Sequence, residues 1–124
     1  MKQTKGWRTL SKRTIHPGKV VHLELEEMLA PDGSQHRLEI VRHGGAAAVV
    51  PITEAGRVVL VRQFRPAIGE RILEIPAGKL DPGENPVHCA GRELEEETGR
   101  TVTELESLGW IWTIFFLRPR PKQR

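Results

Sequence analysis

Four glutamates crowd into five consecutive positions of this chain, and this feature constrains the fold more than any other. They end a stretch that reads GKLDPGENPVHCAGRELEEETGR. Asn85 is a good helix N-cap, Pro86 suits the first helical position, and Gly99 is placed to end the helix in the left-handed conformation. The stretch therefore predicts a loop at 77–84 and a helix over about 86–98.

The helical period gathers the acids on one face. At about 100° per residue, Glu93 and Glu97 lie one turn apart with Glu96 at the edge of their face. Glu95 points away to solvent, and an adjoining apolar stripe is expected to anchor the helix: Val87, Ala90 and Leu94. Neighbouring carboxylates repel one another unless a cation lies between them, and Mg²⁺ or Mn²⁺ prefers such hard oxygen donors. The alternative is a solvated acidic face.

The spacing of the acids favours the metal site. Glu84 stands alone in a loop rich in Gly and Pro, and Arg92 interrupts the acids where it could orient a carboxylate by a bidentate pair. The pattern resembles the signature of the Nudix hydrolases, with eight residues at the expected offsets: Gly78, Glu84, Arg92, Glu93, Leu94, Glu96, Glu97 and Gly99. One departure is Arg100, where that family usually has an aliphatic residue.

Two further stretches, VRQFRP at 61–66 and LEIPAG at 73–78, resemble the ADP-ribose pyrophosphatase branch of that family. The strand hairpin at 19–42 is similar to the branch's N-terminal sheet, so the likeness covers roughly 7–113. The resemblance implies an α+β fold, a Nudix-type α/β/α sandwich with a mixed central sheet and N-terminal antiparallel strands. It also implies hydrolysis of ADP-ribose to AMP and ribose 5-phosphate with divalent metal ions, Mg²⁺ or Mn²⁺.

The resemblance assigns roles by position. Glu93 and Glu97 would ligate metal, Glu96 would ligate metal or help activate water, and Ala77 would offer its backbone carbonyl. Arg92 would hold the carboxylates in place and is counted with them as catalytic. The remaining motif residues would shape the loop and the helix end: Gly78, Glu84 and Gly99.

Two more residues fall where the branch contacts its substrate. Arg65 matches an arginine near the substrate phosphates; the alternative is a surface arginine at a strand end. Glu39 falls where the branch recognises the adenine end from its N-terminal sheet, often across a dimer interface. A homodimer is therefore expected.

Alternating and apolar runs predict strands elsewhere. Strands at 19–28 and 35–42, joined by a turn at 30–34, and an edge strand within 1–15 predict a three-stranded antiparallel sheet, with Val21, Leu23 and Leu25 on one face of the second strand. Two buried strands are expected at 46–53 and 57–64, joined by a turn at 54–56. A short strand is expected at 71–75, and one or two more within 101–112.

The chain is expected to divide into an N-terminal strand region (1–43), an incomplete Nudix core (44–117) and a basic, Pro-rich tail (118–124). After Thr113 the branch normally continues with a loop bearing another catalytic acid, more strands and a closing helix. A truncated or frame-altered member is therefore expected. The alternative function is a catalytically impaired nucleotide- and metal-binding fragment.

Composition limits the other classes of function. The chain has 124 residues, which is enough for one domain. It contains no apolar run long enough to span a bilayer and no secretory signal pattern at its start, so a cytoplasmic protein is expected. Residues 14–117 hold ten basic against sixteen acidic residues, which opposes binding of a nucleic acid despite the basic ends. Cys89 is the only cysteine and is expected to be a small packing or surface residue.

Overall fold

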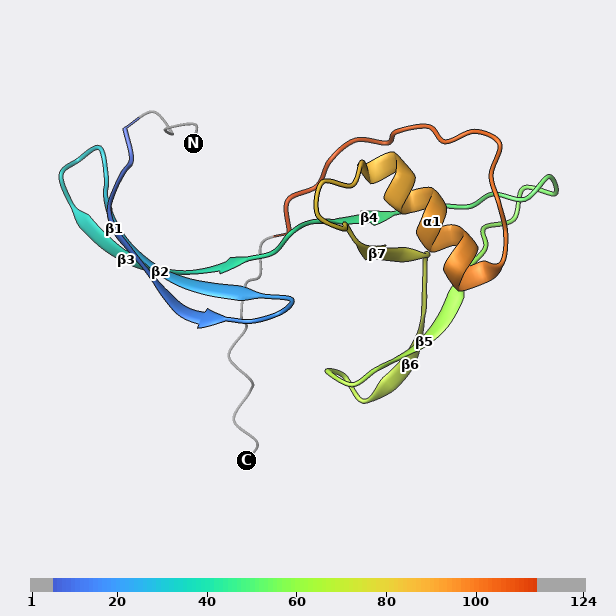
Figure 1. Cartoon of the computed structure of the whole chain (residues 1–124), viewed down its shortest axis with the longest axis horizontal. Helices are drawn as coiled ribbons and strands as arrows, with labels where there is room; N and C mark the ends of the chain where they lie inside the picture. Colours follow the sequence, from blue (N-terminus) through green and yellow to red (C-terminus); the bar gives the residue numbers. More distant parts are fainter. Residues whose placement is uncertain (1–5, 114–124) are drawn as a thin grey trace.

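A computed structural model describes residues 6–113, which form one helix and three separate antiparallel sheets (Figure 1). The elements, in chain order, are β1 (Arg8–Pro17), β2 (His22–Leu29), β3 (Gln35–Arg42), β4 (Ala46–Ala48), β5 (Val61–Arg65), β6 (Glu70–Glu74), β7 (Ala77–Lys79) and α1 (Pro86–Thr98). The predictions for 114–117 and for the tail at 118–124 lie outside the described residues. No helix in the described part is long and apolar enough to cross a membrane.

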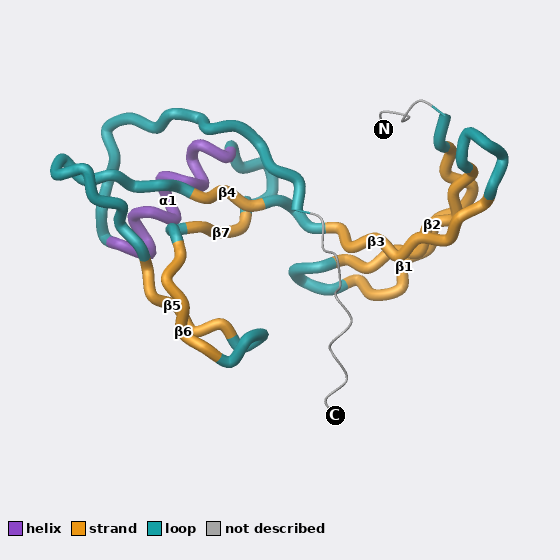
Figure 2. The backbone as a smooth tube through the Cα atoms, turned by 180° about the vertical axis from the view of Figure 1, so that it is seen from behind, coloured by secondary structure: helices purple, strands orange, loops and turns teal. Residues whose placement is uncertain are grey.

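The N-terminal strands form the predicted three-stranded antiparallel sheet, in the order β1-β2-β3. The β2–β3 turn is closed by the Ala30 N–H, which donates to the Ser34 carbonyl at 2.8 Å. β3 has the predicted bounds, whereas β2 begins at His22 rather than at residue 19. Both Figure 1 and Figure 2 show this sheet apart from the helix.

The alternation in β2 predicts that its apolar face is buried, and this prediction is wrong. Val21 is exposed and Leu23 and Leu25 are only half-buried, whereas Glu24 and Glu26 on the other face are buried. Charge pairing explains this result. Lys12 from β1 lies 2.9 Å from Glu24, and Arg42 from β3 binds both glutamates, so the basic side chains cover the acids. Hydrogen bonds from Lys12 and then Arg42 lower the pKa of Glu24.

The helix packs on the β4–β7 ladder, in which Ala47 lies opposite Gly78 (Figure 2). A small core forms there from Val49, Ala90 and Leu94, with Ala47 and Leu105 packed against it. The predicted anchoring stripe is therefore right for Ala90 and Leu94 but wrong for Val87, which is exposed, and fully buried Cys89 contributes instead. This packing fixes the helix beside β7.

The two long buried strands predicted at 46–53 and 57–64 are wrong. Only β4 and β5 form, and Ile52 and Val58 make an isolated bridge around the predicted turn at 54–56. Both bridge residues are exposed. An apolar run becomes a buried strand only when it finds partners on both edges and both faces, and the described residues supply few for this segment. Residues 77–79, predicted as loop, form β7 because they pair with β4.

The strands predicted within 101–112 are also absent from the described structure. This segment passes along α1 (Figure 1), where Leu105 reaches the core. Its aromatic and aliphatic end is exposed: Leu108, Trp110, Ile111 and Trp112. The composition is typical of a strand, but a strand also needs a hydrogen-bonded neighbour, and none of the ladders between residues 6 and 113 includes this segment.

Candidate functional site

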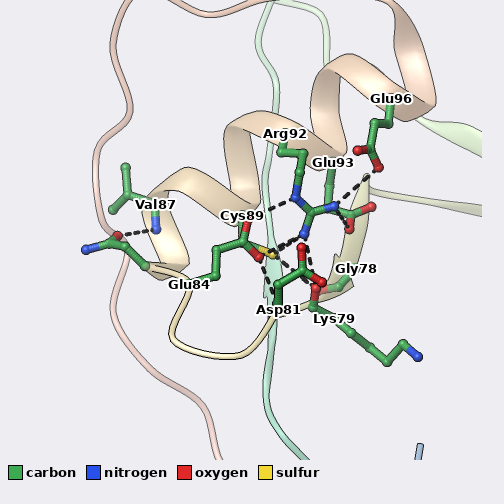
Figure 3. A network of polar contacts seen from close by, with 10 residues as sticks. Gly78, Lys79, Asp81, Glu84, Val87, Cys89, Arg92, Glu93 and Glu96 are labelled. Carbon is green, nitrogen blue, oxygen red and sulfur yellow. Dashed lines mark hydrogen bonds and ion pairs between the residues drawn. The ribbon is translucent and has the colours of Figure 1, made fainter. Parts of the chain in front are cut away.

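Arg92 lies at the centre of a polar network between α1 and the loop that precedes it (Figure 3). Its Nε donates to Glu84 Oε1 and its Nη2 donates to Glu84 Oε2, each at 2.9 Å. This is the planar bidentate pairing that a guanidinium and a carboxylate make best. The pair joins the helix to the loop.

Glu84 accepts a third hydrogen bond, from the Asp81 backbone N–H at 2.9 Å. The bonds from Arg92 and then from Asp81 lower the pKa of Glu84 to about 2. Ionised Glu84 therefore holds the Asp81-Pro82-Gly83 turn against the helix. Its role in the structure is to fix the loop.

The other side of the Arg92 guanidinium contacts the acidic face. Its Nη1 donates to Glu93 Oε1 at 2.8 Å and to Glu96 Oε2 at 3.3 Å, while Nη2 also donates to the Lys79 carbonyl at 3.2 Å. The hydrogen bond to Glu84, followed by that to Glu93, raises the pKa of Arg92. One permanent cation thus offsets the repulsion among the carboxylates and orients two of them.

The strand β7 brings backbone against the same acids. The Ala77 N–H donates to Glu97 Oε2 at 3.3 Å. A Cβ built on Gly78 would overlap the Glu93 carboxylate, so only glycine leaves room for that side chain. Four predicted residues are thereby brought together in two pairs, Ala77 with Glu97 and Gly78 with Glu93.

The helix ends as its capping residues predict. The Asn85 side chain accepts from the Val87 N–H at 2.8 Å, and Gly99 has φ of 69° and donates its N–H to the Glu95 carbonyl. Glu95 is exposed, as the helical period predicts. These local signals fix the register of the acids relative to β7.

The two predicted substrate residues lie outside the Arg92 network. Arg65 ends β5 and is bound by Glu74, with Nη2 to Oε2 at 2.7 Å. Glu39 lies on β3, opposite Leu25, in the sheet that Figure 1 shows apart from α1. The structure therefore does not bring Glu39 together with the other predicted site residues.

The donors beside α1 suit a hard divalent cation, because carboxylate oxygens and the Ala77 carbonyl are the ligands that Mg²⁺ and Mn²⁺ prefer. Among residues 6–113, no three His, Cys, Asp or Glu side chains converge on one point. The acids instead divide between Arg92 and the Ala77 N–H. The donor chemistry fits a metal, and binding one requires these side chains to turn toward it.

Two residues that contact predicted site residues were not themselves predicted. Cys89 is fully buried, and its thiol donates to the carbonyls of Gly78 and Lys79 at 3.6 and 3.5 Å. Burial raises the pKa of this thiol, which agrees with a packing role rather than a nucleophilic one. Glu74, the partner of Arg65, could have been found from the hairpin pattern, which places both residues on one face.

Comparison with known proteins decides the family. The family model described as "NUDIX domain" matches residues 42–124, more than half of the chain. The chain belongs to the Nudix family. The family resemblance predicted from the spacing of Gly78, Glu84 and the Arg92–Gly99 segment is thereby confirmed.

Several known proteins are similar in sequence to this Nudix chain. An ADP-ribose pyrophosphatase of Bacillus subtilis is 44% identical over 106 residues, which cover 86% of this chain and 57% of the relative. An ADP-ribose pyrophosphatase of Mycobacterium tuberculosis is 38% identical over 94 residues, 75% of this chain and 45% of the relative. The methanol dehydrogenase activator of Bacillus methanolicus is 44% identical over 104 residues, 84% of this chain and 55% of the relative. The chain thus spans about half the length of these proteins.

A solved structure supports the fold. The crystal structure of an ADP compounds hydrolase superposes with a TM-score of 0.70 at 24% identity, over 84% of this chain and 57% of that one. At this identity the likeness concerns the fold alone. It confirms the predicted α+β, Nudix-type fold class.

Proposed function

We propose that this Nudix chain catalyses the divalent-metal-dependent hydrolysis of the diphosphate in ADP-ribose or a related nucleoside diphosphate derivative. With ADP-ribose the products are AMP and ribose 5-phosphate. The observation that carries the proposal is the Arg92 network, which orients Glu93 and Glu96 beside β7. The names of the relatives from Bacillus subtilis and Mycobacterium tuberculosis support the choice of substrate.

Each residue of the site has a task in this proposal. Glu93, Glu97 and the Ala77 carbonyl hold the metal, and Glu96 either adds a ligand or accepts a proton from the attacking water. Arg92 and Glu84 keep the acidic face and the loop in register. Bound Mg²⁺ or Mn²⁺ would neutralise the diphosphate and lower the pKa of bound water.

Arg65 and Glu39 complete the proposed site. Arg65 would bind the substrate phosphates through its guanidinium, a geometry that suits phosphate oxygens. Glu39 would contact the adenine end, which from its place on β3 requires either a second copy or an approach of the N-terminal sheet to the helix. We include a homodimer in the proposal for this reason, and we keep the cytoplasmic location that the sequence predicts.

A second candidate is a domain that binds metal and nucleotide without turnover. The division of the acids between Arg92 and Ala77, with no three-acid cluster within the described residues, favours it. Under this alternative the Arg92 network keeps the acidic face folded but does not assemble a reactive centre.

The test is product analysis after incubating the chain with ADP-ribose. With Mg²⁺ we expect equimolar AMP and ribose 5-phosphate, and with EDTA we expect neither. Parallel reactions with Mn²⁺ and with other nucleoside diphosphate sugars rank the metals and substrates. If a folded chain binds ADP-ribose but releases no product with either metal, the non-catalytic candidate is correct.

A further inference from the structure

In the β5–β6 hairpin, Arg65 binds Glu74 and not Glu70, the acid directly opposite it. Arg65 lies directly opposite Glu70 at the turn end of the hairpin, and Val61 lies opposite Glu74 at its other end. The guanidinium nevertheless binds Glu74, with Nε to Oε1 and Oε2 at 2.9 and 3.1 Å and Nη2 to Oε2 at 2.7 Å. The Arg65 side chain therefore runs back along the hairpin, away from its turn.

That direction leads toward the acidic face of α1. Glu74 is three residues before Ala77, whose N–H binds the Glu97 carboxylate. The hydrogen bonds that Arg65 donates to Glu74 are the main cause of the raised pKa of Arg65, and the charge of Glu97 adds to it. The guanidinium is thus held at the end of the hairpin that adjoins the proposed site.

The pairing also leaves part of the guanidinium available. Glu74 engages the Nε and Nη2 edge, and none of the hydrogen bonds among residues 6–113 uses Arg65 Nη1. A guanidinium has five N–H donors in a fixed fork, so fixing one edge determines where the other edge points. The Arg65 side chain is 46% exposed, which allows an anion to reach it.

We propose that Glu74 is a positioning residue, which aims Arg65 at the diphosphate of the substrate. The proposal rests on the proposed function, because it assumes that a nucleoside diphosphate binds beside α1. Glu74 does not touch the substrate; it acts through Arg65. The competing explanation is that the Arg65–Glu74 pair merely joins the two strands of an exposed hairpin.

Binding of ADP-ribose in EDTA, measured by calorimetry, tests the proposal without turnover. We expect Glu74→Gln to weaken binding about fivefold, because the freed guanidinium must be ordered when the ligand binds. Glu70→Gln is the matched control, since Glu70 is on the same face and directly opposite Arg65 but forms no ion pair within the described residues. Binding by the control should stay within about twofold of the wild type.

A double-mutant cycle separates positioning from a structural role. Arg65→Ala should weaken binding at least as much as Glu74→Gln, and adding Glu74→Gln to Arg65→Ala should change nothing further. Glu74→Asp should restore part of the affinity. Equal weakening by Glu74→Gln with and without Arg65 would overturn the proposal, as would equal binding by the Glu74→Gln and Glu70→Gln variants.

Steady-state kinetics with Mg²⁺ tell failure of this proposal from failure of the proposed function. A rise in KM in Glu74→Gln with kcat nearly unchanged supports positioning of a binding group. If the wild type binds ADP-ribose with the expected pattern but never cleaves it, the hydrolase function is wrong and the positioning role stands. If the wild type cleaves ADP-ribose and the Glu74→Gln variant matches the wild type, only the positioning role is wrong.

Discussion

Arg92 contacts Glu84, Glu93 and Glu96 at once, and this one side chain couples the loop geometry to the orientation of the acids. A lysine could not replace it, because an ammonium group lacks the planar fork that binds Glu84 in a bidentate way. The number of residues between Glu84 and Arg92 is therefore set by the length of chain that the turn needs. Glu84 must lie far enough before Arg92 for the turn to bring it back over the helix.

The lowered pKa of Glu84 predicts how stability depends on pH. The ordinary pKa of 4.5 falls to about 2 in the folded chain, so ionised Glu84 stabilises the folded state fully above pH 4.5. The contribution is lost as the pH falls from 4.5 to about 2. Glu84→Gln should lower Tm near neutral pH, with the difference from the wild type shrinking across that window.

Thermal unfolding at several pH values checks this prediction, with Glu95→Gln as a control for removing one exposed charge from the region. A Tm difference for Glu84→Gln that stays constant down to pH 2 would show that the Arg92–Glu84 pair does not carry the pH dependence.

Gly78→Ala should damage the site, because its methyl group would overlap the Glu93 carboxylate. Glu93 would have to leave its position beside β7, and we expect hydrolysis to fall by at least about tenfold. The overlapped atoms are the end of a flexible side chain, so the free energy of unfolding should fall only by the lost Glu93–Arg92 contact, about 1 kcal/mol or less. The initial rate with Mg²⁺ and the midpoint of urea unfolding measure the two effects. Unchanged activity would mean that Glu93 is not needed where it lies.

At the scale of elements, the helix and the strands differ in how far the local sequence determines them. The helix has the predicted bounds within a residue, because its N-cap, its proline and its terminal glycine all act locally. The predictions of strands at 46–53, 57–64 and within 101–112 are wrong, because a strand depends on partners distant in the sequence. An alternating or apolar run does not specify those partners.

The candidate site divides in the same way. Contacts within the motif, such as Glu84 with Arg92, follow from spacing and could be predicted. Strand alternation places Glu70 and Glu74 on the same face as Arg65, but it does not say which of the two the arginine binds. The burial of Glu24 and Glu26 depends on pairing with two other strands. Neither could be read from periodicity, which assigns a glutamate to the solvent face by default.

Gly91→Ala should stabilise the helix. Gly91 lies inside α1, and a Cβ there would meet Leu105 Cδ1 at 3.7 Å, an ordinary van der Waals contact. Alanine is favoured over glycine in a helix interior by about 0.5–1 kcal/mol. Urea unfolding should show this gain with no change in activity. A loss of stability would show that Leu105 packs more tightly on the helix than the structure indicates.

At the scale of the whole molecule, many more large apolar side chains are exposed than are buried in the described core. The described core has few buried residues, whereas Trp110 and Trp112 are 83% and 93% exposed. Contiguous exposed apolar residues promote association in water. The N-terminal sheet, in which exposed basic side chains pair with buried glutamates, makes few contacts with the helix and its β4–β7 ladder.

Replacing both Trp110 and Trp112 with serine should therefore reduce concentration-dependent self-association. Light scattering across a dilution series measures the effect, and Ile52→Ser, which removes an exposed apolar side chain elsewhere, is the control. If the double variant associates as strongly as the wild type, the apolar segment is not the contact surface.

The central claim is that the acidic face of α1 supports hydrolysis. The most direct measurement is the rate of ADP-ribose cleavage with Mg²⁺ by Glu97→Gln beside Glu95→Gln. The first change keeps an acceptor for the Ala77 N–H and removes only the charge, and the second removes an exposed charge two residues away. We predict a loss of at least about a hundredfold for Glu97→Gln and a wild-type rate for Glu95→Gln. Equal rates in the two variants would contradict the claim.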